Sequence, residues 1–155
     1  MVARHLPLSI DRTDLLQIHD LDPALELMYF GWKAMTEEAD AFLATVGLSR
    51  VHHRILYVIA RQPDVTVGSL QQILGISKQA LHRPLKHLLE QDHVVSKRDA
   101  NQHRYKILAL TAQGKRIEHR ASELERKVMK RAFAKVGEDG ASAWMQVMAS
   151  IAERD

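Results

Sequence analysis

The sequence predicts a mainly α-helical protein with one small β-hairpin. Three observations support this fold class. Apolar residues recur at spacings of three and four along most of the 155 residues, a glycine separates two short helical segments, and two β-type segments flank a charged connection. The resulting order is helix, helix, helix-turn-helix, hairpin, helix and helix. This order predicts a winged helix-turn-helix flanked by N- and C-terminal helices, and the apolar stripes of these flanking helices predict that they are dimerising helices.

The first elements are an arm without a sustained period over residues 1–21 and a long helix within residues 22–48. Asp22 is expected to cap that helix, and Pro23 suits the first helical position, where its missing N–H would be unpaired anyway. Gly47 provides the stop. The helix carries one apolar stripe, formed by Leu25, Met28, Tyr29, Trp32, Met35, Phe42, Leu43 and Val46.

Three shorter helices follow, each preceded by a hydroxyl residue that can cap it, namely Ser49, Thr66 and Ser77. The first ends near Gln62-Pro63, and Gly75 allows the tight turn between the other two. The expected buried faces are Val51, Ile55, Val58 and Ile59 in the first helix, Leu70, Ile73 and Leu74 in the second, and Leu81, Leu85, Leu88 and Leu89 in the third, which runs to about Gln91.

The hairpin is predicted from Val94–Lys97 and Tyr105–Leu110, which have β character and enclose a polar connection over residues 98–104. Thr111 then caps a long helix, which the region from Val136 to Gly140 is expected to break. A last helix follows. The apolar positions of these two C-terminal helices are Ile117, Ala121, Leu124, Val128 and Ala132, then Trp144, Val147, Met148 and Ile151.

The composition excludes several classes of protein. No cysteine is present, which excludes disulfides, thiolate metal sites and thiol-based redox switches. No run approaches the roughly 18 apolar residues that a membrane span needs, and the N-terminus lacks the apolar stretch of a signal peptide. The sequence has no phosphate-binding glycine loop, cysteine nucleophile or zinc-protease motif. We therefore expect a cytoplasmic protein that is not an enzyme and has no cofactor.

The net charge of +3 conceals a marked asymmetry. Residues 76–135 hold 15 Lys and Arg against 6 Asp and Glu, whereas residues 1–75 hold 6 against 9 and residues 136–155 hold 1 against 4. A basic middle is typical of a surface that binds a polyanion, because each neutralised phosphate releases condensed counterions. A long solvated helix explains part of this charge equally well, notably between Lys115 and Lys135.

The helix that begins at Lys78 is expected to have two distinct faces. With its leucines turned inward, its outward residues can meet phosphates or base edges, and they are Lys78, Gln79, His82, Arg83 and Lys86. An α-helix fits the DNA major groove, where Arg can read guanine and Gln can read adenine by paired hydrogen bonds. Ser77 and the first backbone amides can hold a phosphate at the helix N-terminus. Many exposed helices have a charged face, but the glycine turn and the adjacent hairpin favour a DNA-reading role.

The run from Leu70 to Arg83, LQQILGISKQALHR, resembles the helix-turn-helix of the MarR family of winged-helix regulators. The family's wing signature, an Asp followed by basic residues and then Leu-Thr-x-x-Gly, is matched by Asp99, Arg104 and Leu110-Thr111-Ala112-Gln113-Gly114. The resemblance implies a homodimer formed by the first helix and the last two, with two DNA-reading lobes for a palindromic site. In the wing, Arg104 is the candidate to enter the minor groove, with His103 beside it.

Members of the family often bind small aromatic or phenolic ligands between the dimer region and the DNA lobe. The residues of this chain that could line such an effector cavity are Tyr29, Trp32, Met35, His53 and Tyr57. Ordinary core or dimer packing explains the same residues at least as well. The nine histidines also raise the hypothesis of a metal sensor. However, adjacent helical residues point about 100° apart, so His52 and His53 cannot easily share one ion, and no metal ligand is assigned.

The sequence therefore predicts a sequence-specific regulator of transcription that binds double-stranded DNA as a homodimer. It is expected to be a repressor that an effector releases by changing the spacing of two reading helices. The alternatives are a winged-helix dimer that serves as a protein-interaction adaptor, and a metal-responsive regulator. The predicted division is an N-terminal arm at 1–21, a dimerisation helix at 22–48, the winged helix-turn-helix DNA-binding region at 49–110, and C-terminal dimerisation helices at 111–155.

Overall fold

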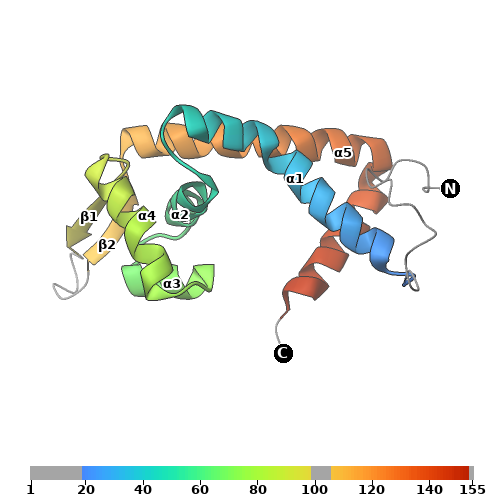
Figure 1. Ribbon diagram of the computed structural model, residues 1–155, viewed down its shortest axis with the longest axis horizontal. Helices are drawn as coiled ribbons and strands as arrows, with labels where there is room; N and C mark the ends of the chain where they lie inside the picture. The colour runs from blue at the N-terminus through green and yellow to red at the C-terminus, as the bar shows by residue number, and fades with distance from the viewer. Residues whose placement is uncertain (1–18, 99–105, 154–155) are drawn as a thin grey trace, which may run out of the picture. The chain divides into compact units, whose positions relative to one another are not determined.

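The computed structural model describes residues 19–98 and 106–153. Its elements follow in the order α1 (Asp22–Thr45), α2 (Arg50–Arg61), α3 (Val67–Leu74), α4 (Lys78–Glu90), β1 (Val94–Arg98), β2 (Lys106–Leu110) and α5 (Ala112–Ala152) (Figure 1). These helices and the two-stranded antiparallel hairpin confirm the predicted fold class. Most of the predicted N-terminal arm, and the connection between β1 and β2, lie outside the described residues.

Helix α1 spans the boundary between two compact units, Met1–Glu37 and Glu38–Asp155, and each unit is described by itself. In the first unit, Asp22 is already helical, and its carboxylate accepts the backbone N–H of His19 at 2.9 Å. The expected capping role of Asp22 is therefore wrong, because the turn before the helix takes its carboxylate. The helix begins one residue earlier than predicted, and the carbonyl of Leu21 accepts backbone N–H bonds at 3.0 and 3.2 Å.

The core of the second unit lies between the end of α1, the helices α2, α3 and α4, the hairpin and the first half of α5. Its largest fully buried side chains are Leu43, Ile55, Leu56, Leu70, Leu81, Leu88 and Val94. The predicted faces are wrong at Val51, Ile73 and Leu89, which are 41%, 51% and 37% exposed because they lie at the edges of their stripes. Leu56 is absent from the predicted face but fully buried, since α2 packs against α3, α4, β2 and α5.

Helices α3 and α4 form the predicted helix-turn-helix (Figure 1). Thr66 caps α3, where its hydroxyl accepts the N–H of Ser69 at 3.2 Å. Gly75 ends α3 with a φ of 63°, a left-handed conformation that favours glycine, and Ser77 then caps α4. Helix α4 continues through Pro84, which is buried in the core. The backbone chemistry of these residues thus turns the chain from one helix directly into the next.

The hairpin is anchored at its base to the start of α3. Strands β1 and β2 pair along their whole length. Leu108 of β2 donates its N–H to the carbonyl of Val65 at 2.8 Å, and Ile107 forms a bridge with Thr66, the residue that caps α3. The position of the described hairpin strands therefore follows from that of the helix-turn-helix.

The start of α5 is held against the turn between α4 and β1. Thr111 accepts the N–H of Gly114 at 3.0 Å and donates its hydroxyl to the carbonyl of Asp92 at 2.7 Å. A Cβ at Gly114 would lie 2.0 Å from the carbonyl oxygen of His93, a distance that no side chain can tolerate without a backbone shift. The Leu-Thr-x-x-Gly motif therefore has a packing role, which is to close α5 against the end of α4.

Helix α5 is interrupted where the sequence predicts a break. Gly137 has a φ of 73° and a ψ of −177°, so two helical segments meet there, which confirms the break expected between Val136 and Gly140. The second segment leaves large apolar side chains between 42% and 59% exposed, at Trp144, Met145, Val147 and Ile151. Over residues 19–98 and 106–153, no helix combines the length and the hydropathy that crossing a bilayer requires.

Candidate nucleic-acid interface

Helix α4 divides into a buried and an exposed face. Leu81, Leu85 and Leu88 are at most 5% exposed and fix the helix in the core. The opposite face is exposed and carries all five residues predicted for it, Lys78, Gln79, His82, Arg83 and Lys86. The last four recur at helical spacings of three and four, so they lie on one side of the helix and can meet one partner together. The exposed face therefore combines fixed positive charge with side chains that can read base edges.

The N-terminus of α4 adds hydrogen-bond donors to this face. Ser77 is exposed, and its hydroxyl accepts the N–H of Ala80 at 3.1 Å, which satisfies one amide of the first turn. The other amides of that turn lie at the positive end of the helix dipole. At the far end of the face, Lys86 and Glu90 are 3.6 Å apart with side chains 62% and 59% exposed, so this pair is weak and leaves Lys86 available to another anion.

The described part of the wing carries two exposed cations. Lys97 of β1 and Lys106 of β2 are exposed near the outer end of the hairpin. Neither residue belongs to the predicted site. Lys97 pairs with Ile107, whereas Lys106 pairs with the next residue, Arg98, so the two lysines lie on opposite faces of the hairpin and cannot both extend the α4 face. The predicted wing contacts, His103 and Arg104, lie outside the described residues.

A series of hydrogen-bonded polar side chains, called the polar chain below, joins α2 to α5. Arg61 donates to Glu118 at 2.7 Å, and its guanidinium carbon lies 3.4 Å from the centre of the Tyr57 ring. Ser122 donates to the same carboxylate at 2.6 Å. The oxygen of Ser122 is 3.2 Å from Nε2 of His53, which is 3% exposed. Because the hydroxyl proton goes to Glu118, this contact requires a proton on Nε2 of His53.

The same polar chain extends to the end of α1. Arg50 of α2 pairs with Asp40 of α1 at 2.6 Å and also with Glu125 of α5. Nδ1 of His53 lies 3.7 Å from Glu125. Helix α2, which packs against α3 and α4, is thereby joined by ion pairs to the end of α1 and to α5.

Two members of this polar chain have shifted pKa values. Burial lowers the pKa of His53 against the opposing effect of Glu125, and Arg50 lowers it further. Burial opposes the ionisation of Glu118, but hydrogen bonds from Ser122 and Arg61 outweigh it and hold the pKa of this carboxyl below its ordinary value. Near neutral pH, His53 is therefore neutral and Glu118 is ionised, which matches the donors and acceptors that surround them.

The five residues predicted to line an effector cavity are distributed over the two units. Tyr29 and Trp32 are 59% and 49% exposed, and Met35 is half-buried, all in the first unit. His53 and Tyr57 belong to the polar chain of the second unit. Two surface grooves, one beside the middle of α5 and one at the base of the wing, are lined by other residues. The effector cavity stays a prediction.

Three histidines gather where α2, α4 and the start of β1 converge. The rings of His52 and His87 have centroids 5.1 Å apart. Burial lowers the pKa of both His52 and His93, and the neighbouring His87 lowers each of them further. In the part of the chain that the structure describes, no group of three or more His, Cys, Asp or Glu could hold a metal ion.

Known proteins share the sequence pattern and the fold. A family model described as the MarR family matches residues 46–104, which include α2, the helix-turn-helix and β1. PetP, an HTH-type transcriptional regulator of Rhodobacter capsulatus, is 31% identical over 131 residues, which are 84% of this chain and 79% of PetP. The chain belongs to the MarR family. It is thus a helix-turn-helix transcriptional regulator, and the resemblance predicted from residues 70–83 is confirmed.

Solved MarR-family structures have the same fold. CouR from Rhodococcus jostii RHA1, bound to p-coumaroyl-CoA, has a TM-score of 0.71 at 19% identity, over 86% of this chain and 94% of CouR. A mutant MarR from E. coli complexed with operator DNA has a TM-score of 0.67 at 16% identity, over 86% of this chain and 96% of that one. A Mycobacterium tuberculosis MarR family protein, in complex with p-aminosalicylic acid, has a TM-score of 0.58 at 19% identity, over 82% and 96%.

Proposed function

We propose that this MarR-family regulator represses transcription as a homodimer that binds a palindromic operator in double-stranded DNA and releases it on binding a small aromatic effector. The observation that carries the proposal is the exposed face of α4 opposite its buried leucines. On this face Gln79 and Arg83 lie one helical turn apart, and these residue types form paired hydrogen bonds with adenine and guanine in the major groove. The DNA-bound E. coli MarR structure, which has the same fold, supports a DNA-binding role.

The remaining polar residues of the interface suit the DNA backbone. Lys78 and Lys86 flank the base-reading pair and carry the fixed charge that phosphates attract. Ser77 and the first amides of α4 suit a phosphate at the helix end. His82 lies between them, and His103 and Arg104 are assigned to the wing contact by their place in the sequence. Base contacts and phosphate contacts are thus divided along one helix.

Homodimerisation is proposed from the apolar side chains that the chain leaves exposed. Those of α1 are between 44% and 63% exposed and comprise Leu25, Leu27, Met28, Tyr29 and Trp32. The second segment of α5 has a similar set. Large apolar side chains exposed along one helix are typical of an interaction surface, and a two-fold partner would cover them while presenting two copies of α4 to the two halves of a palindrome. Light scattering at micromolar concentration tests this, and a monomer that binds DNA with full affinity contradicts it.

An aromatic effector is proposed because two relatives of the same fold hold aromatic ligands, p-coumaroyl-CoA and p-aminosalicylic acid. The candidate lining residues of this chain are Tyr29, Trp32, Met35, His53 and Tyr57. An effector changes DNA affinity only if it binds one arrangement of the reading helices more tightly than the other. Titration with p-aminosalicylic acid, followed by Trp fluorescence in wild type and Tyr57→Ala, should show weaker binding by the variant.

Selection of bound fragments from genomic DNA with the purified protein, followed by affinity measurements on the enriched duplex, tests the function. We expect an enriched palindrome, and an affinity that falls with salt in proportion to the number of phosphates contacted. Lys135→Ala, which removes an exposed cation far from α4 in the sequence, is the control for nonspecific charge effects. If the protein enriches no DNA sequence and binds an acidic protein instead, the alternative of a winged-helix adaptor for protein interactions would be favoured.

A further inference from the structure

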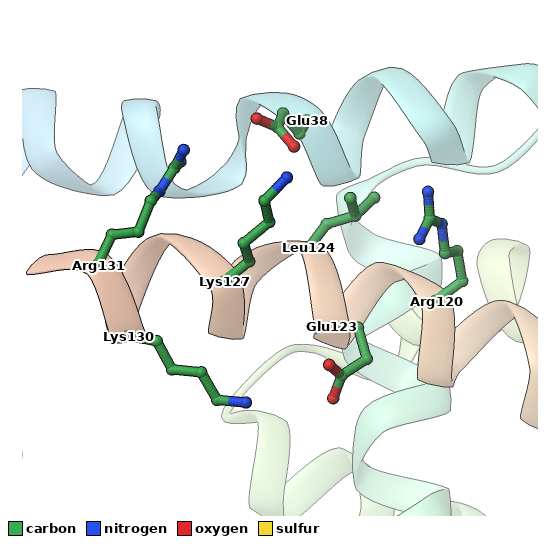
Figure 2. Close-up of a pocket in the computed structure, with 7 residues that line it drawn as sticks. All are labelled: Glu38, Arg120, Glu123, Leu124, Lys127, Lys130 and Arg131. Atoms are coloured by element: carbon green, nitrogen blue, oxygen red, sulfur yellow. The ribbon is translucent and has the colours of Figure 1, made fainter.

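A second concentration of positive charge lies on α5. The cations Arg120, Lys127, Lys130 and Arg131 line one groove of about 450 Å³. In Figure 2, Arg120, Lys127 and Arg131 extend from the edge of α5 that faces the turn of α1 carrying Glu38, whereas Lys130 extends from the opposite edge. Leu124 lies between the first two of these cations and gives the groove an apolar surface.

The carboxylates that line the groove only partly offset these cations, because there are two carboxylates against four cations. Glu38 and Glu123 are the two that line the groove, and Glu123 is already paired with Arg126. Within the described residues, none of the four cations of the groove forms an ion pair or a side-chain hydrogen bond. Lys127 and Arg131 lie one turn apart, and like charges at this spacing repel each other. An anion in the groove would remove that repulsion.

We propose that this groove binds a small organic phosphate. The guanidinium groups of Arg120 and Arg131 can each form paired hydrogen bonds with phosphate oxygens, and Lys127 adds a compact charge between them. A phosphate monoester carries a charge of about −1.5 to −2 near neutral pH, which matches the excess of cations. Leu124 contacts the organic part. The groove also has the size of small-molecule sites, which enclose about 300–1,000 Å³.

The shape of the groove distinguishes this ligand from a DNA duplex. Helix α4 exposes its cations on a convex face, and such a face can enter a groove of the duplex. The cations of α5 line a concave surface beside Glu38, whose carboxylate repels a continuous phosphate backbone but is accommodated next to a single small anion. A DNA duplex is also too large to enter a groove of this volume. The two basic surfaces of the chain therefore take different anions.

The groove is connected to the DNA-reading region through α1 and α2. Asp40 lies on the same turn as Glu38 and pairs with Arg50 of α2 at 2.6 Å. A ligand that bridges α5 and this turn restrains α2, which packs against α3 and α4. The resulting change in operator affinity rests on the proposed function, whereas binding of the phosphate does not.

Isothermal titration of the full chain with pyrophosphate and with adenosine diphosphate tests the proposal. We expect the wild type to bind both probes. The double variant Lys127→Gln/Arg131→Gln should have an affinity for each probe that is lower by a factor of about ten or more, because two charge-assisted contacts are lost. Lys135→Gln removes an exposed cation of the same helix outside the groove and should bind like the wild type. Thermal unfolding followed by circular dichroism verifies that each variant is folded. If the double variant does not fold, Arg131→Lys keeps the charge but loses the paired geometry, and it should still bind more weakly than the wild type.

Four outcomes would overturn the proposal. The first is that neither probe binds to the wild type, and the second is that the wild type and the folded groove variants bind the probes equally. The third is that the double variant binds a DNA duplex more weakly than the wild type in phosphate-free buffer. The fourth is that the molar mass of the double variant in light scattering differs from that of the wild type. The third would make these cations a DNA contact, and the fourth would make them a contact between subunits. The titrations contain no DNA, so failure of the proposed operator binding would leave their result unchanged.

Discussion

The exposed face of α4 and the groove on α5 use the same charged residue types in opposite surroundings. On α4, Arg83 and Lys86 protrude from a helix that buried leucines hold in the core. On α5, Lys127 and Arg131 line a groove of about 450 Å³ that also contains a carboxylate of α1 (Figure 2). Charge alone does not distinguish the two surfaces, but curvature and neighbouring residues do.

The difference teaches which anion each surface can select. A protruding face with Gln79 beside Arg83 can compare one base pair with another, because amide and guanidinium groups match different base edges. A concave site with Leu124 and several cations can compare small anions by size and charge, but it contains no group that reads bases. Our proposal therefore gives sequence recognition to α4 and recognition of a small anion to the groove on α5, and the predictions below test the parts on which that proposal depends.

The largest effect is expected where α5 joins the region that carries α4. Gly114→Ala places a Cβ 2.0 Å from the carbonyl oxygen of His93, so the backbone must move. The free energy of unfolding should fall by about 3 kcal/mol in urea denaturation. In the control Gly68→Ala, the new Cβ meets only Oγ1 of Thr66 at 3.9 Å, and stability should stay equal or rise by up to about 1 kcal/mol. Equal losses in both variants would contradict this packing role.

A smaller effect is expected from the polar chain on the α2 side of α5. Ser122→Ala removes the hydroxyl that donates to Glu118 and that accepts from His53, leaving both buried groups short of a partner. Unfolding in urea should become easier by roughly 2 kcal/mol. The exposed Ser142 supplies the control Ser142→Ala, with a change within about 0.5 kcal/mol. A Ser122→Ala protein as stable as the wild type would show that these hydrogen bonds do not hold α2 to α5.

Stability should also depend on pH through the histidines next to α4. Burial lowers the pKa of His52 and of His93, so these residues are neutral in the folded chain while they bind protons in the unfolded chain below about pH 6.5. The free energy of unfolding should therefore fall as the pH decreases from about 7 to 5.5. His52→Gln keeps an acceptor for the N–H of Ser49 but cannot titrate, so its pH dependence should be shallower. Parallel curves for the two proteins would refute this origin.

The smallest effect on stability is expected at the end of the α4 face. Lys86→Ala removes only an exposed pair with Glu90, so the free energy of unfolding should change by about 0.3 kcal/mol. The slope of log affinity against log salt should nevertheless fall by about 0.9 if Lys86 contacts a phosphate. Filter binding of one duplex at several salt concentrations measures this slope. An unchanged slope would remove Lys86 from the interface.

Local chemistry made much of the fold predictable. Thr66, Ser77 and Thr111 cap the helices that the sequence assigns to them, because capping depends on a side chain and on amides three residues away. Gly75 and Gly137 interrupt helices because their positive φ is accessible to glycine. The two faces of α4 were likewise predictable, since a strong apolar period determines which side of a helix is buried.

Tertiary packing decided the features that the sequence did not predict. Leu56 is buried because four other elements cover α2, and His53 contacts Ser122, which lies 69 residues later in the sequence. From the sequence alone, the cations of α5 are compatible with an ordinary solvated helix. Only the structure shows that Glu38 of α1 lines the same groove. Asp22 shows the converse case, where a nearby N–H competed successfully for a residue expected to cap a helix. The periodicity of a sequence describes one helix or strand at a time, so it does not predict the contacts between elements.

The assignment of sequence reading to α4 is tested most directly by comparing the affinities of Arg83→Ala, Gln79→Ala and the control Lys135→Ala for the selected operator and for its single-base variants. We predict that each α4 variant loses about 1–3 kcal/mol on the preferred duplex and discriminates less at one base position, while the control behaves like the wild type. Unchanged affinity and unchanged base preference in both α4 variants would contradict the account.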